Sequence, residues 1–240
     1  MTRHTAGAAC KYCGKPLKLR IVRTDDVAIY AGREPCSCAM AMRAAEELDV
    51  AEDEGDLHRM LIRHERSLRG ARIPKHYRHA KLAEEDYTFL EAVLAGKSVM
   101  FYGDIGVGKT HRACAIANSL VDEMQVMFAT SKSINDAEFN DKDVLQRFEH
   151  CDLLVLDDAG KMRAESRWYA TQLFDIVNTR YEADRPVIVT SNYSPSGLIK
   201  VLAKAADIET ATATVSRLRE MCGPDPVRMT GVDLRVQPNR

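Results

Sequence analysis

A glycine-rich segment carries the most specific chemical signal in this sequence of 240 residues. Residues 103–110 read Gly-Asp-Ile-Gly-Val-Gly-Lys-Thr, the complete G-x-x-x-x-G-K-T pattern of a phosphate-binding loop, between an apolar run and a helix-forming run. In such a loop the backbone N–H groups wrap phosphates, Lys109 neutralises the β and γ phosphates, and Thr110 offers its hydroxyl to Mg²⁺. The alternative is a chance glycine-rich turn, but the complete pattern favours the loop. The candidate nucleotide-binding residues are Gly103, Asp104, Ile105, Gly106, Val107, Gly108, Lys109, Thr110 and His111.

Two adjacent carboxylates follow a second apolar run. Asp157 and Asp158 come directly after residues 153–156, and the carboxyl end of a parallel strand is where ligands bind. We expect Asp157 to hold the Mg²⁺ shell and Asp158 to polarise an attacking water. Alone, an acidic pair after a strand usually belongs to a turn. About fifty residues after a phosphate loop, it indicates the catalytic edge of an ATPase.

Two more side chains are candidates at the same edge or across a subunit boundary. Asn192 follows the apolar run 187–190, which places a neutral amide where it can orient the lytic water. Arg217 comes after the last predicted strand, and it could reach a γ phosphate on a neighbouring subunit. A surface salt bridge is the alternative for Arg217.

Four cysteines gather in the first 38 residues as Cys10-x-x-Cys13-Gly and Cys36-x-Cys38. Four thiolates fit tetrahedral Zn²⁺, and the glycine permits a tight turn beneath the metal. His4 could replace one ligand. Free structural thiols and a redox pair are the alternatives. A segment so poor in core residues would depend on its metal for folding, and we expect it to dock a partner.

The elements that position these residues follow from the hydrophobic pattern. Short apolar runs bounded by polar or glycine residues predict buried strands, and the longer segments between them predict helices, which gives a parallel sheet with crossover helices. The predicted strands are 98–102, 125–129, 153–156 and 187–190, and the main predicted helices are 110–124 and 165–182. A shorter helix is expected to end at Gly96.

Composition limits the class of protein. The chain has 45% hydrophobic residues, 34 Lys plus Arg against 35 Asp plus Glu, and a net charge of −1, which favours a folded protein without an overall basic excess. An apolar membrane span and a secretory signal are both lacking, so we expect a cytoplasmic protein. Seven cysteines, an odd number, do not suit a fully paired disulfide framework. Cys114, Cys151 and Cys222 are expected to be small buried side chains.

The charges are nevertheless segregated. Residues 44–57 hold acids and no base, whereas residues 58–79 hold a single acid, Glu65, among seven Lys and Arg. Apolar residues at helical spacing predict an amphipathic helix that ends near Gly70 and carries the bases on its outer face. This face is either solvated or in contact with phosphates.

These motifs together resemble the DnaC-like helicase loaders and their IstB-like transposition relatives over about residues 70–235. The resemblance rests on residues 103–111, 153–160, 180–181, 190–192 and 216–218. It implies an AAA+ fold of the α/β class without a separate lid domain, ATP with Mg²⁺ as cofactors, Asn192 as a sensor and Arg217 as an arginine finger. It also implies that residues 73–78 border the adenine and that Arg235 reaches the nucleotide. Asp158 stands where many relatives have glutamate, and its shorter side chain implies slow turnover.

We therefore expect three parts: a zinc-binding docking module at 1–43, a charged helical connector at 44–79, and an AAA+ ATPase domain at 80–240. The expected function is loading of a hexameric replicative helicase onto DNA, with ATP binding and hydrolysis as the switch, single-stranded DNA as a further partner, and self-association through the ATP sites. A transposase helper ATPase and a nucleotide-gated DNA-binding adaptor with little turnover are the alternatives.

Overall fold

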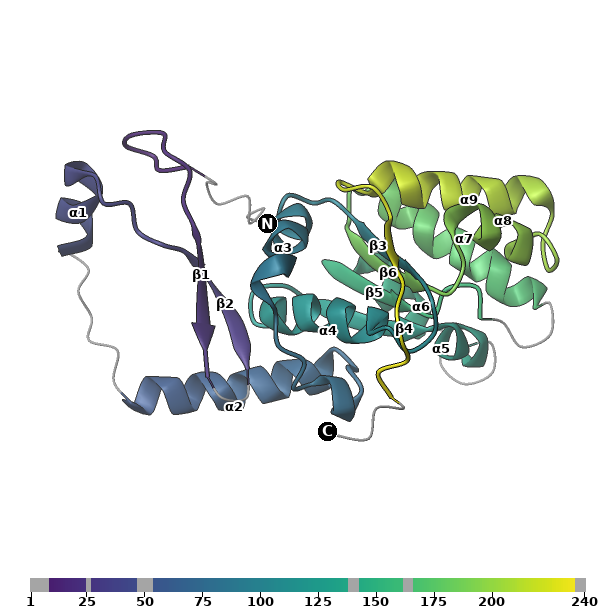
Figure 1. Cartoon of the computed structure of the whole chain (residues 1–240), viewed down its shortest axis with the longest axis horizontal. Coiled ribbons are helices and arrows are strands. Elements are labelled where there is room, and N and C mark those ends of the chain that lie inside the picture. Colours follow the sequence, from purple (N-terminus) through teal and green to yellow (C-terminus); the bar gives the residue numbers. More distant parts are fainter. Residues whose placement is uncertain (1–8, 25–26, 47–53, 138–142, 162–165, 236–240) are drawn as a thin grey trace.

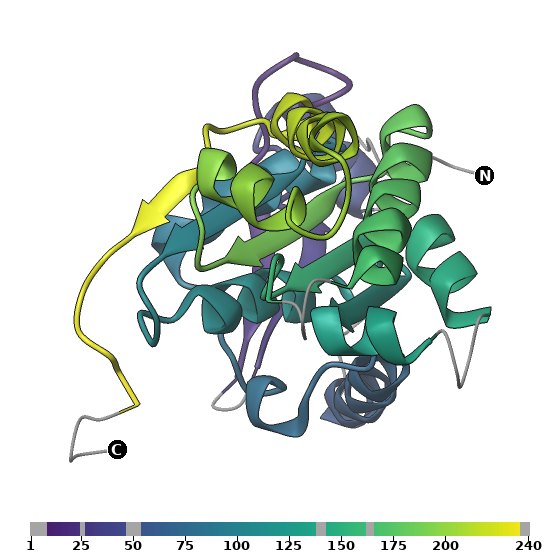
Figure 2. The same cartoon turned by 90° about the vertical axis from the view of Figure 1, so that its right-hand side faces the viewer.

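The computed structural model describes residues 9–24, 27–46, 54–137, 143–161 and 166–235. Its centre is a parallel sheet with helices on both faces (Figures 1 and 2). Within the described residues the sheet has five strands, in the spatial order β4-β5-β6-β3-β7. The strands are β3 (Val99–Gly103), β4 (Val126–Thr130), β5 (Leu153–Asp157), β6 (Val187–Ser191) and β7 (Val227–Met229). The predicted α/β class with a parallel sheet is confirmed.

Alternation along each strand explains why both faces are covered. Val99 and Phe101 of β3 belong to one hydrophobic cluster, whereas Met100 between them belongs to the other. Successive side chains of a strand point to opposite faces, so a run that is apolar at every position needs helices on both sides. The strand β5 is buried at all five positions and lies inside the sheet, between β4 and β6.

The helices form two layers around this sheet. The end of α2 packs with α3 and α4 in the cluster that contains Phe101, and α6, α7, α8 and α9 supply most of the other cluster. The bounds are α2 (Glu54–Gly70), α3 (Tyr87–Leu94), α4 (Lys109–Leu120), α5 (Ser131–Asp136), α6 (Asp143–His150), α7 (Arg167–Glu182), α8 (Pro195–Leu202) and α9 (Ile208–Met221). Short 3₁₀ turns, η1 (Lys75–Tyr77) and η2 (Glu84–Asp86), lead from α2 to α3.

Side-chain caps set where several helices begin. The predicted helix 165–182 starts at Arg167 because the Ser166 side chain accepts a hydrogen bond from the Tyr169 N–H. Ser194 and Asp207 cap α8 and α9 in the same way. The predicted helix 110–124 runs from Lys109 to Leu120. Each predicted element is present with an end displaced by a few residues.

Two pairings were not expected from the sequence. The three residues of β7 pair in parallel with β3, and between the two cysteine pairs β1 (Leu19–Arg23) pairs antiparallel with β2 (Ala28–Arg33). The strand β2 packs against α4, and Arg23 donates to the Leu82 carbonyl at 3.0 Å, so the hairpin is attached to the side of the domain that contains the parallel sheet. The short helix α1 (Ala39–Glu46) lies at the end of the molecule opposite α8 and α9 (Figure 1).

The basic helix predicted to end near Gly70 is α2, which ends at that residue. It is attached to the fold by a buried pair, in which His64 Nδ1 lies 2.5 Å from Asp122 Oδ2, and by Ser67, which donates to Asp122 Oδ1 at 2.8 Å. Leu68 is fully buried beside them, whereas Arg66 and Arg69 are exposed. The arginine-rich side of α2 therefore faces outward.

A buried arginine joins the beginnings of two central strands. Arg180 of α7 is fully buried, and its guanidinium donates to the carbonyls of Cys151 and Pro186 at 2.9 and 2.8 Å, just before β5 and β6. It also donates to the carbonyl of Phe148 at 2.8 Å. The guanidinium thus gives buried carbonyls at the entries of both strands a hydrogen-bond donor. No helix of the described residues is long and apolar enough to span a membrane.

Candidate nucleotide-binding site

The predicted phosphate loop connects β3 to α4 at the carboxyl edge of the sheet. Gly103, Gly106 and Gly108 have φ angles of 132°, 80° and 93°, which side chains rarely adopt. A Cβ on Gly103 would lie 2.0 Å from the Met229 carbonyl oxygen, because β7 passes directly beside this residue. The glycines are therefore required both by the turn and by the approach of a neighbouring strand.

Lys109 lies inside this loop. Its Nζ donates to the Gly103 carbonyl at 3.0 Å and to the Asp104 carbonyl at 2.5 Å, and the residue is only 6% exposed. Burial lowers the pKa of Lys109 from its usual value, and the carboxylate of Asp158 opposes that shift. The ammonium is held at the loop, where a bound phosphate would replace the carbonyls as its partner.

Asp157 ends β5 beside the first turn of α4. The hydroxyls of Thr110 and Thr190 each donate to Asp157 Oδ1 at 2.7 Å. Burial raises the pKa of Asp157, and these two hydrogen bonds act against that increase. Mg²⁺ prefers oxygen ligands, and here a hydroxyl from the phosphate loop already touches a carboxylate. The predicted pair Thr110 and Asp157 therefore fits a magnesium ion.

Asp158 is the next residue and has a left-handed backbone, with φ +55°. This conformation costs a residue with a side chain on the order of 1 kcal/mol, so the surrounding contacts must hold it. Lys161 donates to Asp158 Oδ2 at 2.8 Å, and this hydrogen bond raises the pKa of Lys161. The sequence did not single out Lys161, because a lysine in a turn is common on any surface.

Lys109, Thr110, Asp158 and Lys161 line one cleft of about 640 Å³, and Asp157 is joined to it through its hydrogen bond with Thr110. Asn192 and Asp158, which directly follow β6 and β5, line it together with the residues of the phosphate loop. Tyr77 and His76 line it from η1, as the expectation that residues 73–78 border the nucleotide requires. Burial raises the pKa of Tyr77, whose hydroxyl interacts with Thr110. The loop contributes Ile105, Gly106, Gly108, Lys109, Thr110 and His111 to the lining.

The end of β7 and the residues that follow it, 229–235, lie directly against the phosphate loop. The Asp104 N–H donates to the Met229 carbonyl and the Leu234 N–H to the Gly106 carbonyl, each at 3.0 Å. The Asp233 carboxylate lies against Gly106, so close that a Cβ there would come within 1.9 Å of Oδ1. Leu234 and Arg235 line the cleft. Sequence reasoning missed this segment apart from Arg235, since its apolar residues are too few to show a period.

Arg217 lies away from this cleft, on α9. Its guanidinium carbon lies 5.2 Å from the ring centroid of Phe174 and 5.8 Å from that of Tyr181. Its Nε is buried and has no hydrogen-bond partner within the described part of the chain. The structure thus brings Lys109, Asp157, Asp158 and Asn192 together but does not bring Arg217 to the same site.

The four amino-terminal cysteines do come together. Their Sγ atoms all lie within 4.8 Å of one another, with Cys10 3.9 Å from Cys38 and Cys13 3.5 Å from Cys36. A tetrahedral ion with Zn–S bonds of about 2.3 Å needs edges of about 3.8 Å. Backbone N–H groups of Tyr12 and Cys13 lower the pKa of Cys10 to about 7. The pKa of Cys36, which the Cys38 N–H lowers, is raised overall to about 11 by the neighbouring thiols, so Cys10 loses its proton more readily than Cys36. The donor set fits Zn²⁺. His4, the alternative ligand, lies outside the described residues.

The three remaining cysteines form no disulfide and pack in or beside the hydrophobic core. Cys114 and Cys151 are buried in the two hydrophobic clusters, and Cys222 is partly buried at the end of α9. This agrees with the expectation of buried side chains for Cys114 and Cys151, whereas Cys222 is only partly buried.

The parallel sheet, the glycine-rich loop and the carboxylates at its edge define an AAA+ type of nucleotide-binding protein. Within the described residues α9 leads to β7 and to no separate helical domain. The chain belongs to the family of IstB-like ATP binding proteins, whose pattern it matches over residues 39–238.

Known proteins of this kind match part of the chain. It is 26% identical over 166 residues to the replication initiator DnaA of Roseiflexus castenholzii, which covers 58% of this chain and 33% of DnaA. It is 31% identical over 118 residues to an ATP-binding protein in an insertion sequence of Mycobacterium tuberculosis, covering 46% of this chain and 47% of that protein. The phage-like element PBSX protein XkdC of Bacillus subtilis is 31% identical over 137 residues, with 52% and 47% covered. The chain thus spans less than half the length of these relatives.

Two solved structures share the fold. The crystal structure of DnaI has a TM-score of 0.55 at 22% identity and covers 66% of this chain and 95% of DnaI. The crystal structure of the DnaC helicase loader has a TM-score of 0.51 at 24% identity, with 65% and 100% covered. The predicted family resemblance is confirmed by the family match, and these two structures share the fold.

Proposed function

We propose that this chain is an ATPase that binds a replicative helicase and places it on DNA, with ATP binding and hydrolysis as the switch. The observation that carries the ATPase part is the hydrogen bond from Thr110 to Asp157 beside a cleft that Thr110, Asp158 and Lys109 line. In this role Thr110 and Asp157 hold Mg²⁺ and Lys109 binds the phosphates. Asp158 accepts the proton of the attacking water, and Asn192 orients that water. The shorter carboxylate of Asp158 makes turnover slow.

The likeness in fold to the DnaC helicase loader supports the helicase as partner. We assign its docking to the zinc-binding module at 1–43, joined by the connector at 44–79 to the ATPase domain at 80–240. Beside the cysteines the side chains of Tyr12, Met40 and Met42 are 41%, 59% and 52% exposed, and exposed apolar groups of this kind mark partner surfaces.

Self-association through the ATP sites accounts for Arg217. Its position outside its own cleft and its unpaired buried Nε suit a residue that completes the site of a neighbouring copy. Arg217→Ala should then lose ATP hydrolysis at protein concentrations at which the wild type assembles, while nucleotide binding by the single chain stays within about twofold. Normal hydrolysis by the assembled variant would remove the finger role.

Single-stranded DNA is the third proposed partner, bound by the outward side of α2. Arg59, Arg63, Arg66 and Arg69 of α2 are exposed, and so is Lys75 of η1. Arg66→Gln removes one charge that would contact a phosphate. It should reduce the slope of log affinity for DNA against log salt concentration by about one. Exchanging Lys200 of α8 for Gln is the matched control, since it lies in another layer. An unchanged slope for Arg66→Gln would make this face merely solvated.

A transposase helper is the second candidate, favoured by the relative from an insertion sequence. The full-length protein distinguishes the two when it is used to capture partners from host extract with ATP or ADP. A hexameric helicase retained with ATP and released with ADP supports the loader, and Lys109→Ala should not retain it. Retention of a transposase supports the helper, and retention of DNA alone supports a nucleotide-gated adaptor.

A further inference from the structure

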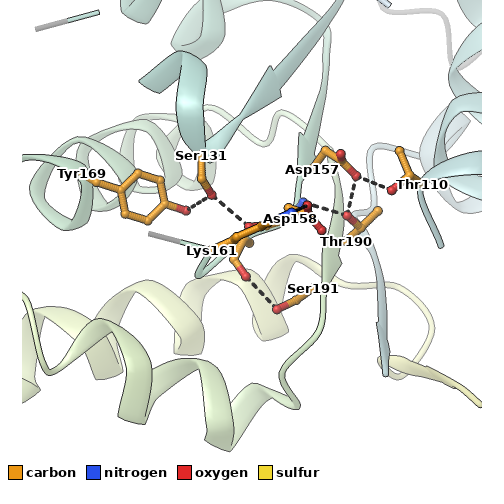
Figure 3. Close-up of polar contacts among 9 residues, drawn as sticks. Thr110, Ser131, Asp157, Asp158, Lys161, Tyr169, Thr190 and Ser191 are labelled. Atoms are coloured by element: carbon orange, nitrogen blue, oxygen red, sulfur yellow. Dashed lines mark hydrogen bonds and ion pairs between the residues drawn. The ribbon is translucent and has the colours of Figure 1, made fainter. Parts of the chain in front are cut away.

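One hydroxyl links the two carboxylate residues of the cleft. Thr190 Oγ1 donates to Asp157 Oδ1 at 2.7 Å and accepts a hydrogen bond from the Asp158 N–H at 2.9 Å (Figure 3). Thr190 is fully buried on β6, next to β5 in the sheet. A hydroxyl has one proton and can donate once while it accepts, so both contacts form at the same time.

A second pair of hydroxyls holds the same turn from the side of β4. Ser131 Oγ donates to the Asp158 carbonyl at 2.9 Å, and Tyr169 Oη lies 2.9 Å from Ser131 Oγ (Figure 3). The Gly160 N–H donates to Tyr169 Oη at 3.2 Å. Since the single Ser131 proton goes to the Asp158 carbonyl, the proton between the two hydroxyls is that of Tyr169. Buried hydrogen bonds from Ser131 and Tyr169 therefore hold the backbone of residues 158–160.

Ala159, between Asp158 and Gly160, is also held by hydrogen bonds. The Ala159 N–H donates to the Thr190 carbonyl at 2.8 Å, and the Ser191 hydroxyl donates to the Ala159 carbonyl at 2.7 Å. The left-handed backbone of Asp158 is thus over-determined by β6 on one side and by Ser131 on the other. Strain of this kind persists only where neighbouring contacts hold it.

We propose, building on the ATPase function above, that Thr190 is a positioning residue for hydrolysis. Its hydroxyl keeps the magnesium-binding carboxylate of Asp157 and the backbone of Asp158 at one spacing, so that both carboxylates serve the same phosphate. Thr110 also donates to Asp157 Oδ1, but its hydroxyl is the one that Mg²⁺ binds. Thr190 is therefore the hydroxyl that stays on the carboxylate when metal enters. Ser131 and Tyr169 contact the backbone of Asp158 and Gly160, and no hydrogen bond joins them to Asp157 in the described part of the chain.

The test compares Thr190→Val, which keeps the shape and removes the hydroxyl, with Thr190→Ser, which restores it. Thr214→Val is the matched control, because Thr214 is equally buried and its hydroxyl donates only to the Thr210 carbonyl of its own helix. Three quantities are measured on the full chain: the melting temperature, the gain in affinity for a non-hydrolysable ATP analogue on adding Mg²⁺, and the rate of phosphate release.

Thr190→Val is expected to bind the analogue normally without metal, to lose most of the Mg²⁺-dependent gain, and to release phosphate about tenfold more slowly, as for loss of a residue that orients a metal ligand. Thr190→Ser should recover both within about threefold, and Thr214→Val should match the wild type. Ser131→Ala should slow phosphate release and leave the Mg²⁺-dependent gain unchanged.

Two results would overturn the proposal. One is a wild-type metal gain and rate in Thr190→Val. The other is a Thr190→Ser variant as impaired as Thr190→Val, which would assign the effect to packing of the methyl group. A wild type that binds nucleotide but never releases phosphate would instead remove the ATPase function, and the metal-dependent gain would still report whether Thr190 positions Asp157.

Discussion

The nucleotide cleft and the four-cysteine cluster are organised in opposite ways. In the cleft Asp157 ends β5 and Asp158 directly follows it, this strand is buried at all five positions, and fixed hydroxyls already hold both residues in place. In the cluster Cys10 is the only one of the four thiols that is buried, and the segment around it offers little apolar surface. The first site is shaped by the protein core before its ligand binds, whereas the second has four thiols that fit one metal ion and less core around them.

This difference separates two uses of binding energy. When the core already holds a site in place, little binding free energy is lost to ordering its residues. Its ligand can therefore bind and dissociate without unfolding the site. A cluster that folds only with its ion keeps the ion, because metal release unfolds the segment. A switch that cycles with ATP suits the first arrangement, and a permanent docking module suits the second.

Removing the metal should have the largest effect. Chelation, or Cys36→Ser, is expected to release about one Zn²⁺ per chain and make residues 9–38 sensitive to protease, because metal binding of this kind contributes about 10 kcal/mol or more to folding. Nucleotide affinity should remain within about twofold. Metal analysis, limited proteolysis and nucleotide titration measure these. Cys222→Ser is the control and should keep the metal. Loss of nucleotide binding on chelation would contradict the independence of the cysteine cluster and the nucleotide cleft.

Prediction from sequence succeeded where the pattern had a physical period. The buried strands show as unbroken apolar runs, and the phosphate loop shows as spaced glycines, so the sheet and the residues from Gly103 to Thr110 could be placed. The four cysteines could be grouped because few chemistries need Cys-x-x-Cys-Gly near Cys-x-Cys.

The remaining features depend on contacts that no local pattern records. Thr190 resembles any strand threonine until its neighbour β5 is known, and β7 has only three residues, which is too short to show alternation. The hairpin of β1 and β2 mixes charged and apolar residues, because one side packs on α4 and the other does not. Arg180 sits in a helix of ordinary polarity, and only the fold makes it buried.

Removing the buried arginine at the beginnings of β5 and β6 should have the next largest effect, on the free energy of unfolding. Arg180→Met is expected to lower the free energy of unfolding by about 3 kcal/mol or more, because carbonyls at the entries to β5 and β6 lose their donor in the interior. Denaturant titration measures it. Arg185→Met is the control, since Arg185 is partly exposed and should cost less than about 0.5 kcal/mol. Equal stability of the two variants would mean that Arg180 does not support the sheet.

Removing the loop cation tests the cleft itself. Lys109→Ala should reduce ATP affinity at least about 100-fold, through loss of a charge-assisted contact with phosphate in a partly buried site. Calorimetric titration measures this loss, and zinc content should be unchanged. Lys97→Ala, before β3, is the control. Wild-type affinity in Lys109→Ala would contradict the phosphate-loop assignment.

The smallest effect is expected from the segment that crosses the loop. Asp233→Asn removes a negative charge that lies against Gly106, where phosphate enters, and should tighten ATP binding about threefold to fivefold, or about 1 kcal/mol. Asp225→Asn, on an exposed turn, should not change the affinity. Weaker binding by Asp233→Asn would show instead that this carboxylate supports the nucleotide.

Amide hydrogen exchange on the full-length protein tests the contrast between the two regions most directly. The amides of Asp158 and Ala159, which donate to Thr190, are expected to be protected without nucleotide and to remain so when metal is chelated. The amides of Cys10 and Gly14, which donate within the first cysteine turn, should be protected with Zn²⁺ and exchange rapidly once it is removed. Rapid exchange at Asp158 and Ala159 until nucleotide is added would contradict a cleft organised by the core.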